Sequence, residues 1–79
     1  MTSVFKKNIR GVVYSFYRAT ANDLVAYYVL FDGGNGERKS FKIEMDEYGS
    51  WQLEGAGEGL KNLASQFIAI VVDNENPTP

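Results

Sequence analysis

The sequence of 79 residues contains no cysteine and no histidine. Without cysteine there can be no disulfide, and without either residue the usual zinc and transition-metal sites are excluded. A Ser-His-Asp triad and a Cys-His pair are excluded as well. Carboxylates remain between residues 44 and 58, but acids that alternate along a strand or border a turn are typical of solvated positions. We therefore expect a non-enzymatic protein with no cofactor and no metal.

Long hydrophobic runs and an excess of charge of one sign are also missing. The longest apolar runs, LVAYYVLF at residues 24–31 and FIAIVV at residues 67–72, are far shorter than a membrane-spanning helix, and the first residues lack the apolar core of a signal peptide. Ten acidic and eight basic residues give a net charge of −2, which favours neither nucleic acid nor an anionic membrane. We expect a cytoplasmic protein with no membrane contact, and the absence of cysteine is also compatible with the periplasm.

The chain is long enough for one small domain and too short for two hydrophobic cores. A domain of this size buries only about 60% of the surface that its unfolded chain exposes, so its stability is marginal. Because no disulfide or metal can stabilise it further, additional burial has to come from association.

Four segments have the composition of β-strands. NIRGVVYSFYR at residues 8–18 and LVAYYVLF at 24–31 are rich in β-branched and aromatic residues. In SFKIEM at 40–45 apolar and polar residues alternate, and SWQLE at 50–54 continues the alternation after the turn DEYG. These segments predict an antiparallel meander of four strands.

After residue 58 the apolar period changes from that of a strand to that of a helix. The apolar stripe consists of Leu60, Leu63, Ala64, Phe67, Ile68 and Val71. Asn74 is a plausible end of this helix, and the β-branched residues at 68–72 leave open a late change to extended chain. We expect one domain over residues 1–73 and a disordered tail over 74–79.

The predicted fold is a two-layer α+β domain in which one helix packs on one face of a four-stranded antiparallel sheet. A helix of about 15 residues is roughly 22 Å long, which is enough to cover one face of such a sheet but not both. The two periods predict a single core cluster, in which Trp51 is a core residue rather than a ligand platform. Its members are Phe41, Ile43, Trp51, Leu53, Leu60, Leu63, Phe67 and Ile68.

The predicted helix-free face of the sheet is the main candidate for an interaction site. In the first predicted strand, Gly11 and Ser15 are small enough to face a closely packed helix, so the odd positions are expected to point inward. The even positions then form an exposed apolar patch, which usually marks an interface. These candidate interface residues are Arg10, Val12, Tyr14, Phe16 and Arg18.

In the order of its elements, four strands and then a helix, the segment 8–72 resembles the purine-rich-element-binding repeat and a single-strand-binding transcriptional coactivator domain. Both families dimerise, so the resemblance implies a dimer of this architecture. No motif matches either family residue by residue, and no functional residue is carried over.

The sequence favours a protein-association module that forms a homodimer or binds a protein partner through the helix-free face. One alternative is a single-stranded nucleic-acid-binding module, in which Tyr14 and Phe16 would stack bases between Arg10 and Arg18. A third is a small-ligand binder between helix and sheet. The glycine-rich stretches DGGNGE and GAGEGL match neither a calcium loop nor a dinucleotide fingerprint, and we interpret them as turns.

Overall fold

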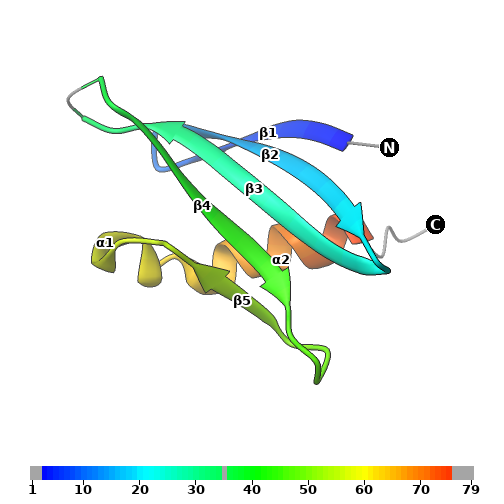
Figure 1. Ribbon diagram of the computed structural model, residues 1–79. Coiled ribbons are helices and arrows are strands. Elements are labelled where there is room, and N and C mark those ends of the chain that lie inside the picture. Colours follow the sequence, from blue (N-terminus) through cyan, green and yellow to red (C-terminus); the bar gives the residue numbers. More distant parts are fainter. Residues whose placement is uncertain (1–2, 35, 76–79) are drawn as a thin grey trace.

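The computed structural model describes residues 3–34 and 36–75, which form one antiparallel sheet and a helical layer on one of its faces (Figure 1). The sheet has five strands in the order β1-β2-β3-β4-β5. They are β1 Ser3–Ile9, β2 Val12–Ala21, β3 Leu24–Asp32, β4 Arg38–Met45 and β5 Trp51–Glu54. The helices are α1 Glu58–Lys61 and α2 Ala64–Glu75. The two-layer α+β fold and the meander are confirmed, and the predicted number of four strands is one too few.

The additional strand arises because the predicted strand 8–18 is divided by a tight hairpin turn. Arg10 and Gly11 both have positive φ, 53° and 85°, and they join Ile9 to its partner Val12. Positive φ at both central residues is characteristic of the type I′ turn, whose twist matches that of the two strands of a hairpin. The Oδ1 atom of Asn8 accepts a hydrogen bond from the Gly11 amide at 3.0 Å, which supports the turn. Five strands therefore precede the helix, one more than in the order on which the family resemblance was based.

The turn between β4 and β5 forms where the DEYG motif predicted it. Oδ1 of Asp46 accepts hydrogen bonds from the amides of Tyr48 and Ser50, both at 2.9 Å. Gly49 takes a φ of 83°, which glycine adopts without steric cost. The carboxylate at the head of the turn thus fixes the register in which β5 pairs with β4.

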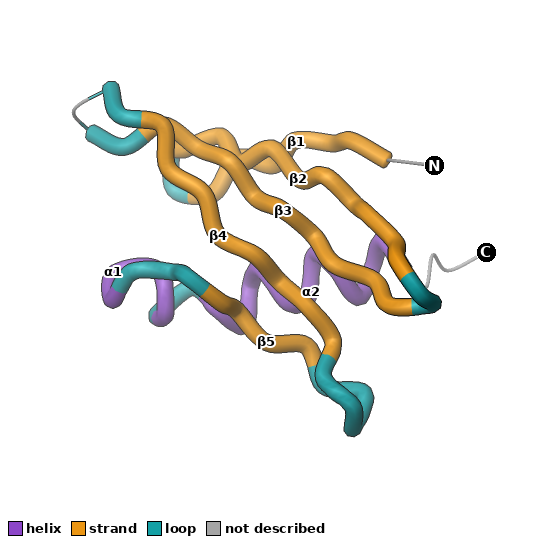
Figure 2. Tube along the Cα trace, viewed as in Figure 1, coloured by secondary structure: helices purple, strands orange, loops and turns teal. Residues whose placement is uncertain are grey.

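The predicted single helix is broken between residues 61 and 64. The Leu63 amide bonds to the Leu60 carbonyl at 2.9 Å, the shorter i to i+3 spacing of a tight turn. After this break α2 runs across the sheet (Figure 2), so one face is covered and the other is free of helix. The helix extends through Asn74 and Glu75, which were expected to be in the tail. The rest of the predicted tail, residues 76–79, lies outside the described residues.

The core lies between α2 and the sheet, and Phe67 is at its centre. The Phe67 ring makes edge-to-face contacts with Tyr14 and Phe41, with centroids 4.9 Å and 5.0 Å away. Every predicted core residue is in this cluster or packs against it except Ile68, which is half-buried. The cluster also contains residues that the prediction did not include, namely Ile9, Tyr14, Phe16, Tyr27, Val29 and Val71.

A polar network attaches the end of α2 to the sheet. The Arg18 guanidinium donates two hydrogen bonds to the Glu75 carboxylate, from Nε at 2.6 Å and Nη2 at 3.1 Å. The Tyr27 hydroxyl also donates to Glu75, and the Asn74 side-chain amide donates to the Tyr27 oxygen at 2.7 Å. Hydrogen bonding from Arg18 lowers the pKa of Glu75, so the carboxylate stays ionised to a lower pH than an ordinary glutamate. This network explains why the helix continues beyond Val72.

Candidate interaction surface

The two faces of β2 are assigned the opposite way from the prediction. Tyr14 and Phe16 have exposed fractions of only 3% and 0%, and both rings contact Phe67 of α2. The prediction failed because it took Gly11 as a small residue inside a strand, whereas Gly11 belongs to the turn. Once the turn is recognised, Ser15 alone is weak evidence for an inward face.

None of the five predicted interface residues lies on the helix-free face. Arg10 is exposed in the β1–β2 turn. Val12, Tyr14 and Phe16 lie on the helix-covered side, where they pack in the core cluster or against it. Arg18 lies on that side too, bound to Glu75. The predicted residues therefore do not form an exposed patch on the helix-free face. The register of the strands identifies the residues that do.

Residues paired across an antiparallel sheet share a face, so the register identifies the helix-free face directly. One row across the sheet consists of Val4, Tyr17, Tyr28, Lys42 and Glu54. Its first three members are apolar or aromatic and lie on β1, β2 and β3. The apolar residues of the helix-free face thus lie on β1, β2 and β3, away from the short strand β5.

We define the outer apolar patch as five residues of this face: Val4, Val13, Tyr17, Tyr28 and Leu30. The exposed fractions of Val4, Val13 and Tyr28 are 55%, 49% and 48%, and the other two are half-buried. A hollow of about 240 Å³ lies beside them, with Ser15, Tyr17 and Leu30 among its lining residues. Projecting side chains next to a hollow are suited to interdigitate with the side chains of a second surface.

The charged groups of the helix-free face are distributed unevenly. Lys42 lies 3.2 Å from Glu44 and 3.5 Å from Glu54, and hydrogen bonding to Glu44, with the charges of both acids, raises the pKa of Lys42. This group of one lysine and two glutamates carries a net charge of −1 on β4 and β5. On the other side, β1 contributes the exposed Lys6 to the same face, and the Arg38 and Asp32 pair that borders the hollow adds no net charge. The apolar patch is therefore bordered by a basic side and an acidic side.

The residues of the helix-free face alternate with core residues along β2 and β3, but those on β2 occupy the positions that were expected to point inward. Tyr17 and Tyr28 are two residues from Ser15 and Leu30, and the correct position of the hairpin turn would have placed all four outward. The signal for that turn was Asn8 three residues before Gly11, a spacing that lets the Asn side chain bond to the glycine amide.

The described part of the chain offers no sign of metal or membrane chemistry. Residues 3–34 and 36–75 contain no group of three or more acidic side chains that could hold a metal ion. Within the same ranges, neither helix is long and apolar enough to span a bilayer.

In comparisons with known proteins, no family model matches the chain, and no curated protein or solved structure is significantly similar to it.

Proposed function

We propose that the protein is a non-enzymatic association module that pairs with a second copy through the helix-free face. The outer apolar patch is the observation that carries this proposal. An open sheet face with exposed tyrosine and valine side chains is costly to leave in water, and such patches usually mark interaction sites. A two-fold dimer covers the same patch on both copies.

The size of the face limits the strength of this dimer. Five strands about 4.8 Å apart and about seven residues long make a face of roughly 20 by 23 Å, or roughly 450 Å² in projection. Stable interfaces bury roughly 800 Å² on each partner. We therefore expect a dimer with a dissociation constant in the micromolar range, whose population depends on concentration.

The charges favour one orientation of the two copies. With the two-fold axis parallel to the strands, β1 of one copy faces β5 of the other, and Lys6 approaches the acidic group around Glu54. With the axis perpendicular to the strands, the β1 strands face each other and bring like charges together. Since like charges across an interface are costly, we propose the first arrangement, in which β3 of each copy lies over β3 of the other and β1 and β2 are covered by β5 and β4.

Sedimentation velocity and light scattering from a few micromolar to several hundred micromolar test the proposal. The unmodified protein should shift from monomer to dimer over this range. The double variant Tyr17→Ser and Tyr28→Ser should stay monomeric while keeping its far-ultraviolet circular dichroism, because both residues point away from the core. As a matched control, Tyr48→Ser removes a tyrosine that is 83% exposed at the β4–β5 turn, and it should dimerise normally. A monomer at several hundred micromolar contradicts the proposal.

The same samples distinguish self-association from single-stranded nucleic-acid binding. The aromatic and arginine platform expected for that function is not exposed, because Tyr14 and Phe16 are buried and Arg18 is bound to Glu75. We expect a fluorescently labelled single-stranded oligonucleotide to show no change in anisotropy at physiological salt. Micromolar binding that is lost in the Tyr17→Ser and Tyr28→Ser variant would instead assign the face to nucleic acid.

A further inference from the structure

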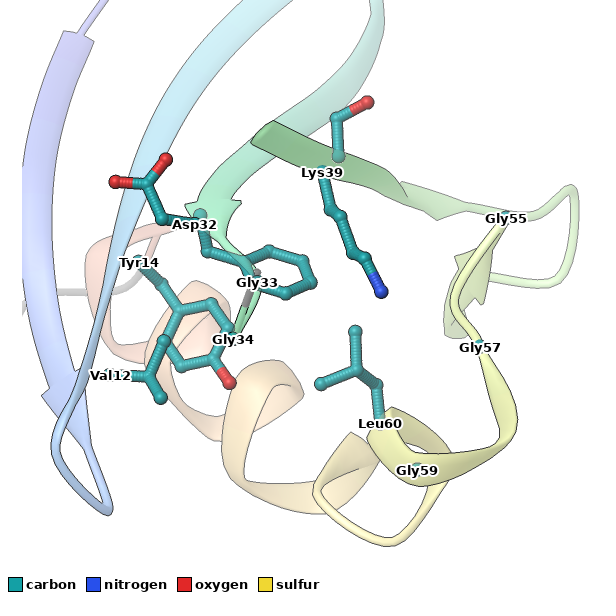
Figure 3. Close-up of a pocket in the computed structure, with 12 residues that line it drawn as sticks. Val12, Tyr14, Asp32, Gly33, Gly34, Lys39, Gly55, Gly57, Gly59 and Leu60 are labelled. Carbon is teal, nitrogen blue, oxygen red and sulfur yellow. The ribbon is translucent and has the colours of Figure 1, made fainter. Parts of the chain in front are cut away.

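A cleft opens between the helical layer and the sheet, on the side opposite the outer apolar patch. It has a volume of about 460 Å³, within the range of small-molecule sites. Its walls come from the start of β2, the end of β3 with the two glycines that follow it, the start of β4, and α1 with the segment that leads into it. Both glycine-rich stretches of the sequence border it, with Gly33 and Gly34 on one side and Gly55, Gly57 and Gly59 on the other (Figure 3).

The floor of the cleft is aromatic and aliphatic. The Tyr14 and Phe31 rings lie in contact, with centroids 5.1 Å apart, and Val12 and Leu60 complete the apolar lining. Phe31, Val12 and Leu60 are each only half-buried, so apolar surface remains open to a ligand. The glycines have no side chains that could fill this space, and an added Cβ at Gly34, Gly55, Gly57 or Gly59 would meet no atom within 4 Å.

One positive charge enters this apolar space. The Lys39 side chain passes over Gly33 and turns its nitrogen toward Leu60, and the hydroxyl end of Tyr14 approaches Leu60 from the other wall (Figure 3). Neither group has a side-chain partner among the described residues. Burial raises the pKa of Tyr14, so its hydroxyl stays protonated and able to donate. Among the described residues, the only carboxylate that borders the cleft, on Asp32, lies 3.7 Å from Arg38 and points away from Lys39 (Figure 3).

We propose that this cleft binds a small monocarboxylate with an aromatic or branched apolar body. The apolar body would lie on Tyr14, Phe31 and Leu60, and the carboxylate would accept hydrogen bonds from the Lys39 ammonium and the Tyr14 hydroxyl. A phosphate ester fits less well, because a dianion among apolar walls needs more than one cation to replace its water. The site is independent of the proposed dimer, since it lies on the other side of the sheet.

Titration of the whole chain, followed by two-dimensional amide NMR, tests this proposal with a matched pair of compounds. The probe is 3-phenylpropionate, and 3-phenylpropanamide is its uncharged analogue of the same shape. We expect the carboxylate to shift the amide signals of the five cleft glycines with a dissociation constant of roughly 1 mM, as its small size allows. The amide should bind at least about tenfold more weakly, because it lacks the charge-assisted contact.

Two variants address charge and volume separately. Lys39→Met should weaken 3-phenylpropionate about tenfold and leave the amide unchanged, whereas Lys61→Met, the same loss of charge on α1 outside the cleft, should change neither. Gly59→Leu should block both compounds, because its side chain would extend into the cleft. It should also raise the melting temperature, because leucine has the higher helix propensity and a Cβ added at Gly59 meets no atom within 4 Å. If Gly59→Leu does not fold, Lys39→Met still decides the result.

The proposal is overturned if the two compounds bind equally, if Lys39→Met leaves carboxylate binding unchanged, or if the cleft glycines do not shift at about 10 mM of probe. Signals that move only on the helix-free face would show binding at a different site and would overturn it as well.

Discussion

At the scale of single residues, Glu75 links the stability of the fold to pH. Its pKa is lowered, mainly by the hydrogen bonds from Arg18, relative to an ordinary value of about 4.3 in an unfolded chain. A carboxylate with a depressed pKa in the folded state stabilises the fold fully above the unfolded value, and this contribution is lost as pH falls through the folded value. The network should therefore contribute at neutral pH and disappear in the acid range.

We predict that Glu75→Gln lowers the free energy of unfolding by about 1–2 kcal/mol at pH 7, because it weakens charge-assisted hydrogen bonds in a half-buried place. Urea denaturation at pH 7 and pH 3 measures this difference, which should become much smaller at pH 3. Glu58→Gln is the control, since Glu58 pairs with Lys61 at an exposed position and should have little effect at either pH. An equal loss at both values of pH would contradict the role of ionisation.

Burial of the β2 aromatics leads to a second prediction at the residue scale. Tyr14→Ser with Phe16→Ser should unfold the domain, because each change removes a large side chain from contact with Phe67 and truncation of a buried aromatic costs about 3–5 kcal/mol. The combined loss is comparable to the whole stability of a small domain. Circular dichroism and amide NMR should show an unfolded chain, and a folded monomer would mean that these residues lie on the surface.

At the scale of secondary-structure elements, the β1–β2 turn determines which face of the sheet each residue occupies. Arg10 takes a φ of 53°, which costs a non-glycine residue about 1–2 kcal/mol, whereas Asn is favoured at this position before glycine. We predict that Arg10→Asn raises the melting temperature by several degrees. Gly11→Ala should lower it, since Gly11 has a φ of 85° that alanine adopts only with strain. Thermal unfolding followed by circular dichroism measures both, and a shift in the same direction for both variants would contradict this account of the turn.

The same turn explains how much of the structure could be predicted from the sequence. The alternation of Phe41, Ile43 and Met45 and the helical stripe that includes Phe67 gave the correct class of fold, because these periods directly reflect burial. The turn was missed because arginine is rarely found with positive φ, so Arg10 looked like a strand residue. That one error removed a strand and reversed the phase of the next, which placed the candidate interface on the wrong face.

The cleft and the break in the helix were harder to predict for a different reason. The break at Asn62 interrupts no apolar period, since Leu60 and Leu63 remain on the side of the core. The cleft depends on how far α1 and the β3–β4 connection lie from each other, and this is a result of packing rather than of local pattern. The glycines on either side indicated turns correctly, but only the structure shows that the two stretches border one cavity.

At the scale of the whole molecule, the last prediction concerns the orientation of the proposed dimer. Lys6 and Glu54 lie on the two edge strands of the same face, about 19 Å apart at four strand spacings, so they interact negligibly within one copy. In the proposed arrangement, Lys6 of one copy approaches Glu54 of the other. Lys6→Glu alone and Glu54→Lys alone should each weaken the dimer, by about 0.5–1 kcal/mol for an exposed pair. The double variant should restore most of the affinity, because the charges are exchanged and the attraction is kept.

Sedimentation equilibrium of the four proteins at low salt measures this coupling. Repeating it at 0.5 M salt should reduce the coupling, because exposed charges are then screened. The loss of affinity in Glu54→Lys includes disruption of the contact with Lys42 within the same copy. Comparing the double variant with the two single variants isolates the part of the loss that comes from the Lys6 and Glu54 contact between copies. If the two single losses simply add in the double variant, the copies do not pack with β1 over β5. A dimer that still depends on Tyr17 and Tyr28 would then require the perpendicular axis, with the β1 strands facing each other.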